Sequence, residues 1–239
     1  MYNKNVVILK TSQRGVAMKY LDRKNSILAI KNIRSLFSDL EEVYSSYGID
    51  ISRDVGRKNI LISAAQEHFF AKAIGNIVKN CTNDGRTGMA DIVIQSLNNR
   101  EVECKVLCKG KSGSWSLQTD KASLERKGSC DFLYLLFDRS HDNVAVLLFD
   151  SLVADDFYDP SPGSRGKARL KKSVAFKKCT PLVGSFLNKR KHYMKKYLEE
   201  SLAANTSSQA KDKAEQKYQL WYNKEDSYSI QLENVNELT

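Results

Sequence analysis

The N-terminal third of the chain has apolar residues at helical spacing. Within residues 26–47 they fall on one stripe, which comprises Ile27, Ile30, Ile33, Leu36, Phe37, Leu40 and Val43. Gly48 follows this stripe, at the position where a glycine commonly ends a helix. A second pattern of the same kind runs from about Ile60 to Lys79. The pattern predicts two amphipathic helices, one after the other.

After residue 80 the pattern changes to short extended runs. Residues 83–88 have the composition of a turn, and two extended runs follow, over 90–95 and 101–108. The polar residues 96–100 between them predict the loop of a β-hairpin. Residues 116–127 predict a short helix that Gly128 closes.

The second half of the chain contains two continuous apolar runs, over 132–137 and 144–149. Runs of this kind are typical of strands covered on both faces. A last long helix is predicted over 182–203, and residues 205–239 are expected to form a polar, partly packed C-terminal tail. The order of elements predicts one α/β domain over residues 1–204, a layered fold with a central mixed β-sheet.

Composition restricts the class of protein. The chain has 239 residues, of which 41% are hydrophobic and 28% charged, as in a folded globular protein. No apolar run approaches the roughly 20 residues that span a bilayer, and the N-terminal apolar stretch is too short for a signal peptide. The five cysteines, an odd number, are expected to be reduced thiols. These features predict a cytoplasmic protein.

Positive charge is concentrated in one block. The formal net charge is +10, and residues 160–198 contain no Asp or Glu. The basic residues of this block are Arg165, Lys167, Arg169, Lys171, Lys172, Lys177, Lys178, Lys189, Arg190, Lys191, Lys195 and Lys196. A surface with one sign of charge attracts a polyanion such as DNA, although a charge run is also compatible with an ordinary solvated face.

The predicted hairpin carries charge where burial is expected. Asp91 lies on its first strand, and Glu103 and Lys105 lie on one face of its second. Two carboxylates on neighbouring strands repel each other unless a cation lies between them, and Mg²⁺ takes one or two protein carboxylates in this way. Asp91 and Glu103 share a face only if the loop has an odd number of residues or a bulge resets the register. The hypothesis therefore predicts an odd loop or a bulge, and a loop centred on Leu97 would place the two acids directly opposite each other.

The segment Gly88-Met89-Ala90-Asp91, followed by Glu103-Cys104-Lys105, resembles the signature of the PD-(D/E)XK nuclease superfamily, which includes the restriction endonucleases. The resemblance implies a restriction-endonuclease-like fold with an α/β/α layered core and phosphodiester cleavage that leaves a 5′-phosphate. It implies a protein of the prokaryotic cytosol or nucleoid. It also implies Mg²⁺ as cofactor, for which Mn²⁺ can substitute. Asp91 and Glu103 match the metal-binding carboxylates of the family, and Lys105 matches its catalytic lysine. Ala90 stands where the motif has proline.

Two further residues match the resemblance less specifically. Glu67, on the predicted helix before the hairpin, matches an acidic residue of many members, and an ordinary exposed glutamate is an equal alternative. Gln118 matches a glutamine near the site of several members, and a polar surface residue is the alternative. Candidate DNA contacts are Lys109, Lys111, Ser112 and Trp115 in the loop after the hairpin, and Arg165, Lys167, Arg169, Lys171 and Lys172 in the basic block.

The resulting hypothesis is a Type II restriction endonuclease that acts as a homodimer on double-stranded DNA, with a cognate DNA methyltransferase for the same site. A structure-specific nuclease of the same superfamily, such as a junction resolvase or repair nickase, remains open. So does a non-catalytic DNA-binding protein that uses only the basic block. The chain has no Walker A loop, and its three histidines match no zinc-nuclease or HNH pattern.

Overall fold

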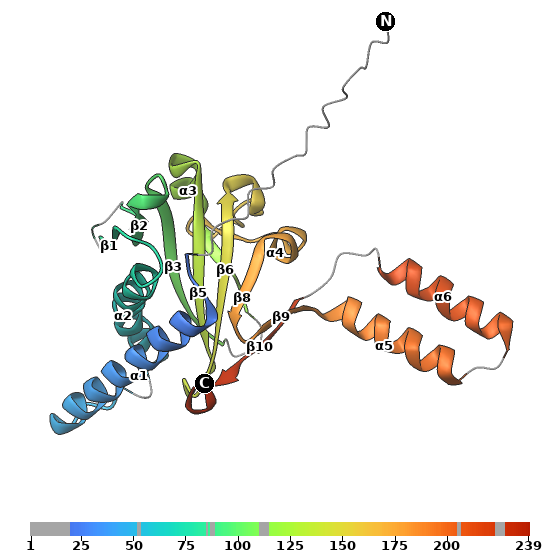
Figure 1. Cartoon of the computed structure of the whole chain (residues 1–239), viewed down its shortest axis with the longest axis horizontal. Helices are drawn as coiled ribbons and strands as arrows, with labels where there is room; N and C mark the ends of the chain where they lie inside the picture. The colour runs from blue at the N-terminus through green and yellow to red at the C-terminus, as the bar shows by residue number, and fades with distance from the viewer. Residues whose placement is uncertain are drawn as a thin grey trace, which may run out of the picture.

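A seven-stranded mixed sheet forms the centre of the protein (Figure 1). The computed structural model describes residues 20–51, 54–84, 86, 89–109, 115–204, 207–222 and 228–239. The strands of the sheet are β1 (Cys81–Asn83), β2 (Ile92–Ile94), β3 (Arg100–Cys108), β5 (Ser129–Phe137), β6 (Asn143–Val153), β8 (Cys179–Val183) and β11 (Glu233–Asn234). Their order is β1-β2-β3-β5-β6-β11, with β8 also paired to β6. The predicted α/β class with a central mixed sheet is confirmed.

Pairing within the sheet is antiparallel except between β3 and β5, among the strands described. Two strands share one edge of β6. β8 pairs with residues 146–149 of β6, and β11 pairs with residues 143–144. That edge is therefore covered by two segments that lie far apart in the chain.

Two helices cover one face of the sheet, α1 (Arg23–Ser46) and α2 (Val55–Gly75). The side chain of Asp54 accepts a hydrogen bond from the backbone of Arg57 at 3.0 Å, and this cap explains why α2 begins before the predicted Ile60. Gly48 has a φ of +74° just after α1, as the predicted helix-ending glycine requires. Both N-terminal helices are thus confirmed, with shifted ends for α2.

The opposite face is covered by α3 (Lys121–Lys127), α4 (Lys172–Lys178) and a two-stranded ribbon of β4 (Gln118–Asp120) and β7 (Lys167–Arg169). Their apolar side chains pack on the sheet in a second core cluster, which includes Leu117, Leu124, Phe132, Tyr134 and Ala175. Helices thus lie on both faces of the central mixed sheet, as in the α/β/α core expected for this chain.

Two predicted helices begin too early. The predicted helix over 116–127 opens with strand β4, and α3 starts only at Lys121, where Asp120 caps it by accepting the backbone N–H of Ser123 at 2.8 Å. The predicted helix over 182–203 opens with strand β9 (Ser185–Asn188), and α5 spans Lys189–Ala204. In both cases these residues form a strand, because they pair with a strand that is distant in the sequence, although the local pattern predicted a helix.

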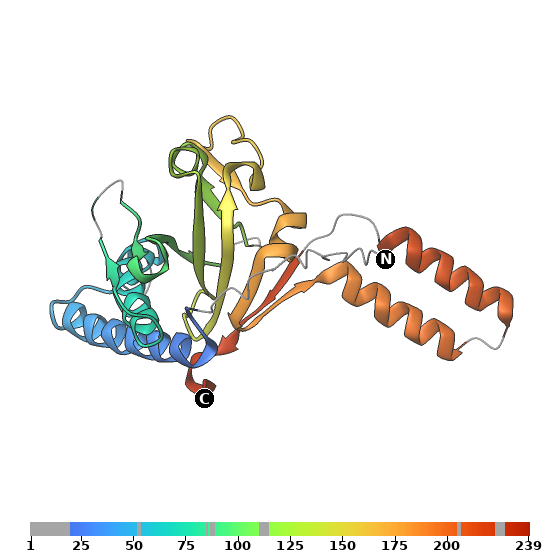
Figure 2. The ribbon, with the colours of Figure 1, turned by 45° about the horizontal axis from the view of Figure 1, so that its top comes forward.

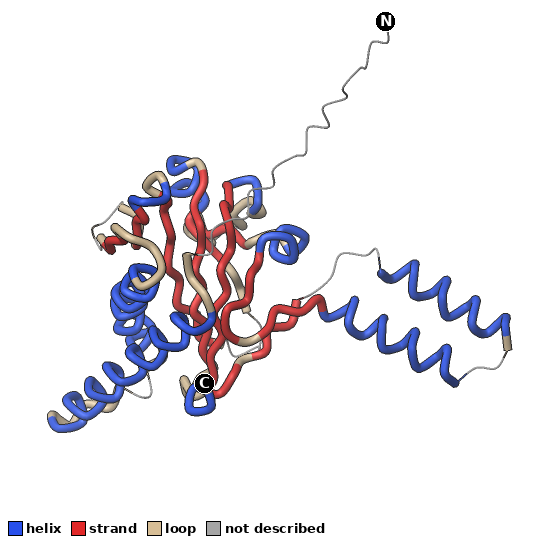
Figure 3. The backbone as a smooth tube through the Cα atoms, viewed as in Figure 1, coloured by secondary structure: helices blue, strands red, loops and turns tan. Residues whose placement is uncertain are grey.

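Helices α5 and α6 (Ser208–Tyr222) form an arm that extends away from the sheet (Figures 1, 2 and 3). The arm is joined to the body through β9 and β10 (Tyr228–Gln231). These two strands pair with each other, with Asn188 opposite Tyr228. Residues 205–239, expected to form a polar tail, thus contain α6, β10 and β11.

A buried ion pair fixes the start of the parallel pair. Arg100, at the beginning of β3, donates to both carboxylate oxygens of Asp131 on β5, at 2.5 and 3.0 Å. Asp131 is 2% exposed and also accepts a hydrogen bond from the hydroxyl of Tyr20 at 2.6 Å. Because each polar atom finds a partner, the buried charge sets the register of β3 against β5.

No helix in the described part of the chain is long and apolar enough to cross a membrane. The five cysteines are all free thiols, as expected from their odd number.

Candidate functional site

The β2–β3 hairpin places Asp91 and Glu103 opposite each other. Ile92 pairs with Val102 and Ile94 with Arg100, so one further step of the same register brings Asp91 to Glu103. The loop holds the five residues 95–99, of which Asn98 and Asn99 have positive φ angles of 57° and 55°. The predicted odd loop, centred on Leu97, is confirmed. A carboxylate oxygen of Asp91 accepts the backbone N–H of Cys104 at 2.6 Å, which fixes the side chain against β3.

Glu103 and Lys105 lie on the face of the sheet that α3 covers. Val102 and Cys104 belong to the core cluster under α1 and α2, so the alternate residues of β3 point to the other side. Lys105 Nζ lies 2.6 Å from Glu103 Oε1. Lys127, the last residue of α3, places its Nζ 2.9 Å from Glu103 Oε2. Both oxygens of Glu103 therefore face an ammonium group.

The two carboxylates have opposite electrostatic environments. Burial, followed by repulsion from Glu103, raises the pKa of Asp91, and the hydrogen bond from Cys104 offsets only part of this effect. Burial would also raise the pKa of Glu103, but Lys105 and Lys127 outweigh it and lower that pKa. The negative charge of Glu103 is thus compensated, while Cys104, Lys105 and Lys127 compensate that of Asp91 only in part.

Glu67 contributes a third carboxylate from α2. Burial raises its pKa, the charge of Asp91 raises it further, and the charge of Lys105 lowers it. Glu67 is therefore close enough to the pair on the hairpin for its charge to interact with them. In the residues that the structure describes, no three His, Cys, Asp or Glu side chains lie close enough together to hold a metal ion.

A metal ion at this position would rely on Asp91 and Glu103. Mg²⁺ needs only one or two protein carboxylates, because water and phosphate oxygens fill its other positions. The incompletely compensated charge of Asp91 opposite Glu103 fits such a cation, provided that Glu103 exchanges a lysine contact for it. The residues present are thus suited to a hard divalent ion.

A small cavity adjoins Glu103 and Lys105. Its volume is about 60 Å³, enough for a few water molecules. It is lined by Glu103, Lys105, Thr119, Asp120, Ser123, Leu124, Lys127, Cys130 and Phe132. The wall opposite β3 therefore comes from β4 and α3, and the cavity lies between the two lysines that contact Glu103.

Other predicted residues take different positions. Gln118 lies on β4 and not on a helix, does not line the cavity, and donates through its amide to Ser116 Oγ at 2.6 Å. Trp115 is half-buried against the second core cluster, and Lys109 is exposed. Lys111 and Ser112 fall outside the described residues.

Residues 167–169 of the basic block lie one strand away from the cavity wall. In the β4–β7 ribbon Lys167 pairs with Asp120 and Arg169 with Gln118, and both basic side chains are exposed. Arg165 and Lys172 are exposed as well. We call Arg165, Lys167, Arg169 and Lys172 the basic strip. Lys171 differs, because its side chain is half-buried and donates to the carbonyl of Asp155 at 2.6 Å.

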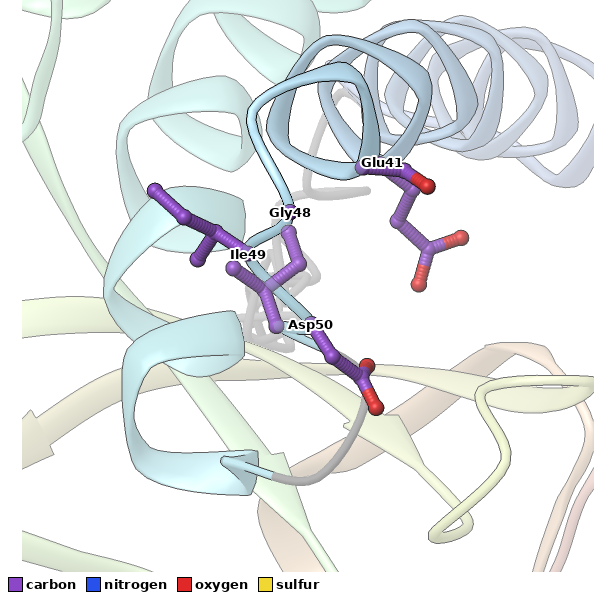
Figure 4. Close-up of a pocket in the computed structure, with 6 residues that line it drawn as sticks. Glu41, Gly48, Ile49 and Asp50 are labelled. Atoms are coloured by element: carbon purple, nitrogen blue, oxygen red, sulfur yellow. The ribbon is translucent and has the colours of Figure 1, made fainter.

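A second hollow lies at the end of α1 (Figure 4). Its volume is about 420 Å³, and it is lined by Glu41, Ser45, Gly48, Ile49, Asp50 and Ile51. Glu41 is paired there with Lys58 at 3.3 Å. Although larger, this hollow shares none of its described lining residues with the cavity beside Glu103, and its acids Glu41 and Asp50 do not lie on the hairpin.

Sequence reasoning missed Lys127, Thr119 and Asp120, which complete the cavity. The phase of α3 brings Lys127 over β3, and its neighbour Arg126 is exposed. The sequence offers no signal that separates these two adjacent basic residues. For Thr119 and Asp120, the polar residues before the helix gave a weak signal of a capped start.

Comparison of the chain with protein-family models, with curated proteins and with solved structures gave no significant match.

Proposed function

We propose that the protein is an Mg²⁺-dependent endonuclease that cleaves double-stranded DNA at specific sites, as Type II restriction enzymes do. The observation that carries this proposal is the placement of Asp91 opposite Glu103, with Lys105 beside Glu103 on the same face of β3. Acids on two paired strands with an adjacent amine form a site suited to phosphodiester hydrolysis.

In this proposal Asp91 and Glu103 hold the ion, which when bound polarises the phosphate and lowers the pKa of a water molecule. Cys104 fixes the carboxylate of Asp91 through its backbone N–H, so that one oxygen stays free to bind. The ammonium of Lys105 holds the attacking water or stabilises the negative charge that develops on the phosphate. Glu67 adds negative charge from α2, which favours a cation at the site.

The basic strip supplies the DNA contact. Lys167 and Arg169 lie on the ribbon whose other strand lines the cavity, and Arg165 and Lys172 flank β7, so phosphates bound to the strip would be held on the side of the molecule where Glu103 and Lys105 lie. Contacts of this kind position a duplex without reading its sequence, and they weaken as salt rises. One such site in each chain cuts one strand, and a twofold-symmetric homodimer would therefore cut both.

The test is digestion of a mixed-sequence plasmid with Mg²⁺, followed by mapping of the ends. We expect discrete fragments with 5′-phosphates from the wild type. Lys105→Ala should lower the cleavage rate by at least about 100-fold, because loss of a group that stabilises transition-state charge has effects of this size. Its DNA affinity, measured in EDTA, should stay within about threefold of the wild type.

Glu125→Gln serves as the matched control, because it removes an exposed carboxylate of α3 that does not line the cavity. Cleavage by Lys105→Ala at the wild-type rate would overturn the proposal. Cutting restricted to junctions or mismatches would indicate a structure-specific nuclease with the same chemistry. Salt-sensitive binding without any cleavage would instead indicate a non-catalytic DNA-binding protein.

A further inference from the structure

Lys127 is the second amine of the candidate site. Its Nζ lies 2.9 Å from Glu103 Oε2 and 3.8 Å from Glu101 Oε2, and its side chain is only 16% exposed. Lys105 Nζ takes the other oxygen of Glu103, at 2.6 Å. The carboxylate that the proposed function assigns to a metal ion is therefore engaged by ammonium groups on both sides.

We propose that Lys127 is a positioning residue that holds Glu103 in place and competes with a divalent cation for this carboxylate. The inference rests on the proposed function, which makes Glu103 a metal ligand. Lys105 and Lys127 offset the charge of Glu103, so a cation that enters without DNA has to displace an ammonium group from this carboxylate. A phosphate adds negative charge to the same site and offsets that cost. Lys127 thus couples loading of the ion to the presence of DNA.

The cavity supports this role. Lys127 lines it together with Lys105, Thr119 and Ser123, so an ammonium that leaves Glu103 has open space with polar groups beside it. Lys127 is the last residue of α3, Gly128 follows it with a φ of +79°, and β5 begins at the next residue. The backbone of Lys127 thus lies directly between the body of α3 and the start of β5.

The experiment measures Mn²⁺ binding to the full-length protein without DNA, by calorimetry and by electron paramagnetic resonance. Lys127→Met keeps the length of the side chain and removes its charge, so we expect Mn²⁺ to bind at least about fivefold more tightly, a coupling of the usual size between two linked sites. Lys127→Arg retains the charge and should bind Mn²⁺ with the wild-type Kd. Lys127→Gln provides a second neutral variant if the methionine is not tolerated.

Lys121→Met is the matched control. Lys121 begins the same helix, is 15% exposed and pairs with Asp159 at 2.6 Å, away from Glu103. The Lys121→Met substitution removes the same charge from a side chain of similar exposure. The Kd of this variant for Mn²⁺ should stay within about twofold of the wild type.

The outcomes separate the two proposals. If Lys127→Met and Lys127→Gln bind Mn²⁺ no more tightly than Lys121→Met, while the wild type binds the ion and cleaves DNA, the role of Lys127 is wrong and the proposed function stands. If no variant and no wild-type sample binds Mn²⁺, with or without duplex DNA, both proposals are overturned.

Discussion

Asp91 is the residue whose charge is least compensated in the candidate site. The carboxylate of Asp91 accepts a hydrogen bond from the backbone N–H of Cys104. Lys105 and Lys127 contact Glu103 directly. The raised pKa of Asp91 and the lowered pKa of Glu103 record this asymmetry. A half-buried carboxylate with a raised pKa lowers the stability of the fold at neutral pH, so stability alone does not explain why Asp91 stands on the hairpin.

This asymmetry predicts an effect of pH on stability. The pKa of Asp91 is higher in the folded than in the unfolded chain, so the folded state loses stability as pH rises through the interval between the two values. Asp91→Asn removes this loss. In EDTA the variant should therefore have a higher Tm than the wild type at pH 7–8, by about 2–4 °C for each kcal/mol relieved, and no advantage at low pH, below both pKa values.

Asp84→Asn is the contrasting control. Its hydrogen bond with Arg86 lowers the pKa of Asp84, so the stability it adds is present at neutral pH and lost as pH falls. The substitution should give no gain in Tm at pH 7–8. Thermal unfolding of both variants from pH 3 to 8 checks the prediction, and a lower Tm for Asp91→Asn at neutral pH would contradict it.

At the scale of elements, the junction between β8 and β9 depends on one glycine. Gly184 has a φ of +77°, and a Cβ there would collide with the carbonyl of Gln231 and the side chain of Ala145. Its N–H also donates to Glu233 Oε1 at 2.6 Å. These contacts allow the chain to leave the central sheet and pair with β10.

Gly184→Ala is therefore expected to be strongly destabilising. Gly163→Ala is the matched control, since Gly163 has a similar φ of +80° with open space around it. The control should cost about 1–2 kcal/mol for the left-handed backbone alone, and Gly184→Ala should cost clearly more because a backbone carbonyl must also move. Urea denaturation measures both. Equal losses would mean that the contact with Gln231 has no energetic consequence.

Elements with a strong local pattern could be predicted from the sequence. The apolar stripe of α1 and the continuous apolar runs of β5 and β6 depend on neighbouring residues only. The three-residue strands β4 and β7 could not be predicted, because each forms only when its partner about fifty residues away is in place. The same limit explains why β9 was assigned to a helix.

The candidate site divides in the same way. The spacing of Asp91, Glu103 and Lys105 can be read from the sequence. The parity of the loop could be predicted only from the hypothesis that the two acids share a face, because a two-residue turn on Asn98-Asn99 would have placed them on opposite faces. The contact of Lys127 with Glu103 depends on how α3 lies over β3, which is a tertiary relation. Pattern reasoning therefore found the acids and one amine, and missed the second amine.

At the scale of the whole molecule, the α5–α6 arm is attached at one place. Its helices pack on each other, and its connection to the body passes through the paired residues Asn188 and Tyr228 (Figures 1 and 2). A two-residue turn can join residues that face each other in this way. The geometry allows the arm to be removed without altering the register of β9 and β10.

We predict that replacing residues 189–227 with Asn-Gly leaves the body folded, with a Tm close to that of the wild type. Residues 189–196 contain five Lys and Arg, so DNA binding should weaken and its dependence on salt should become shallower, by at most about 0.9 in the log–log slope for each lost phosphate contact. Circular dichroism and fluorescence anisotropy at several salt concentrations check both parts.

The intact arm with Lys195→Gln and Lys196→Gln is the control for charge alone. Both side chains are exposed and pair only within α5, with Glu199 and Glu200. An unfolded body after removal of the arm would show that α5 and α6 stabilise the sheet, in contradiction to their single point of attachment.

The two segments that share one edge of β6 also affect how the protein is made. Residues 143–144 find their partner β11 only at positions 233–234, near the end of the sequence. During synthesis on the ribosome, β3, β5 and β6 can associate long before this last ladder closes, and part of the β6 edge is then open to strands of other nascent chains. Slow translation of the arm would lengthen that interval, so recovery of native protein in a cell should depend on chaperones that protect the exposed edge until residues 233–234 have been made.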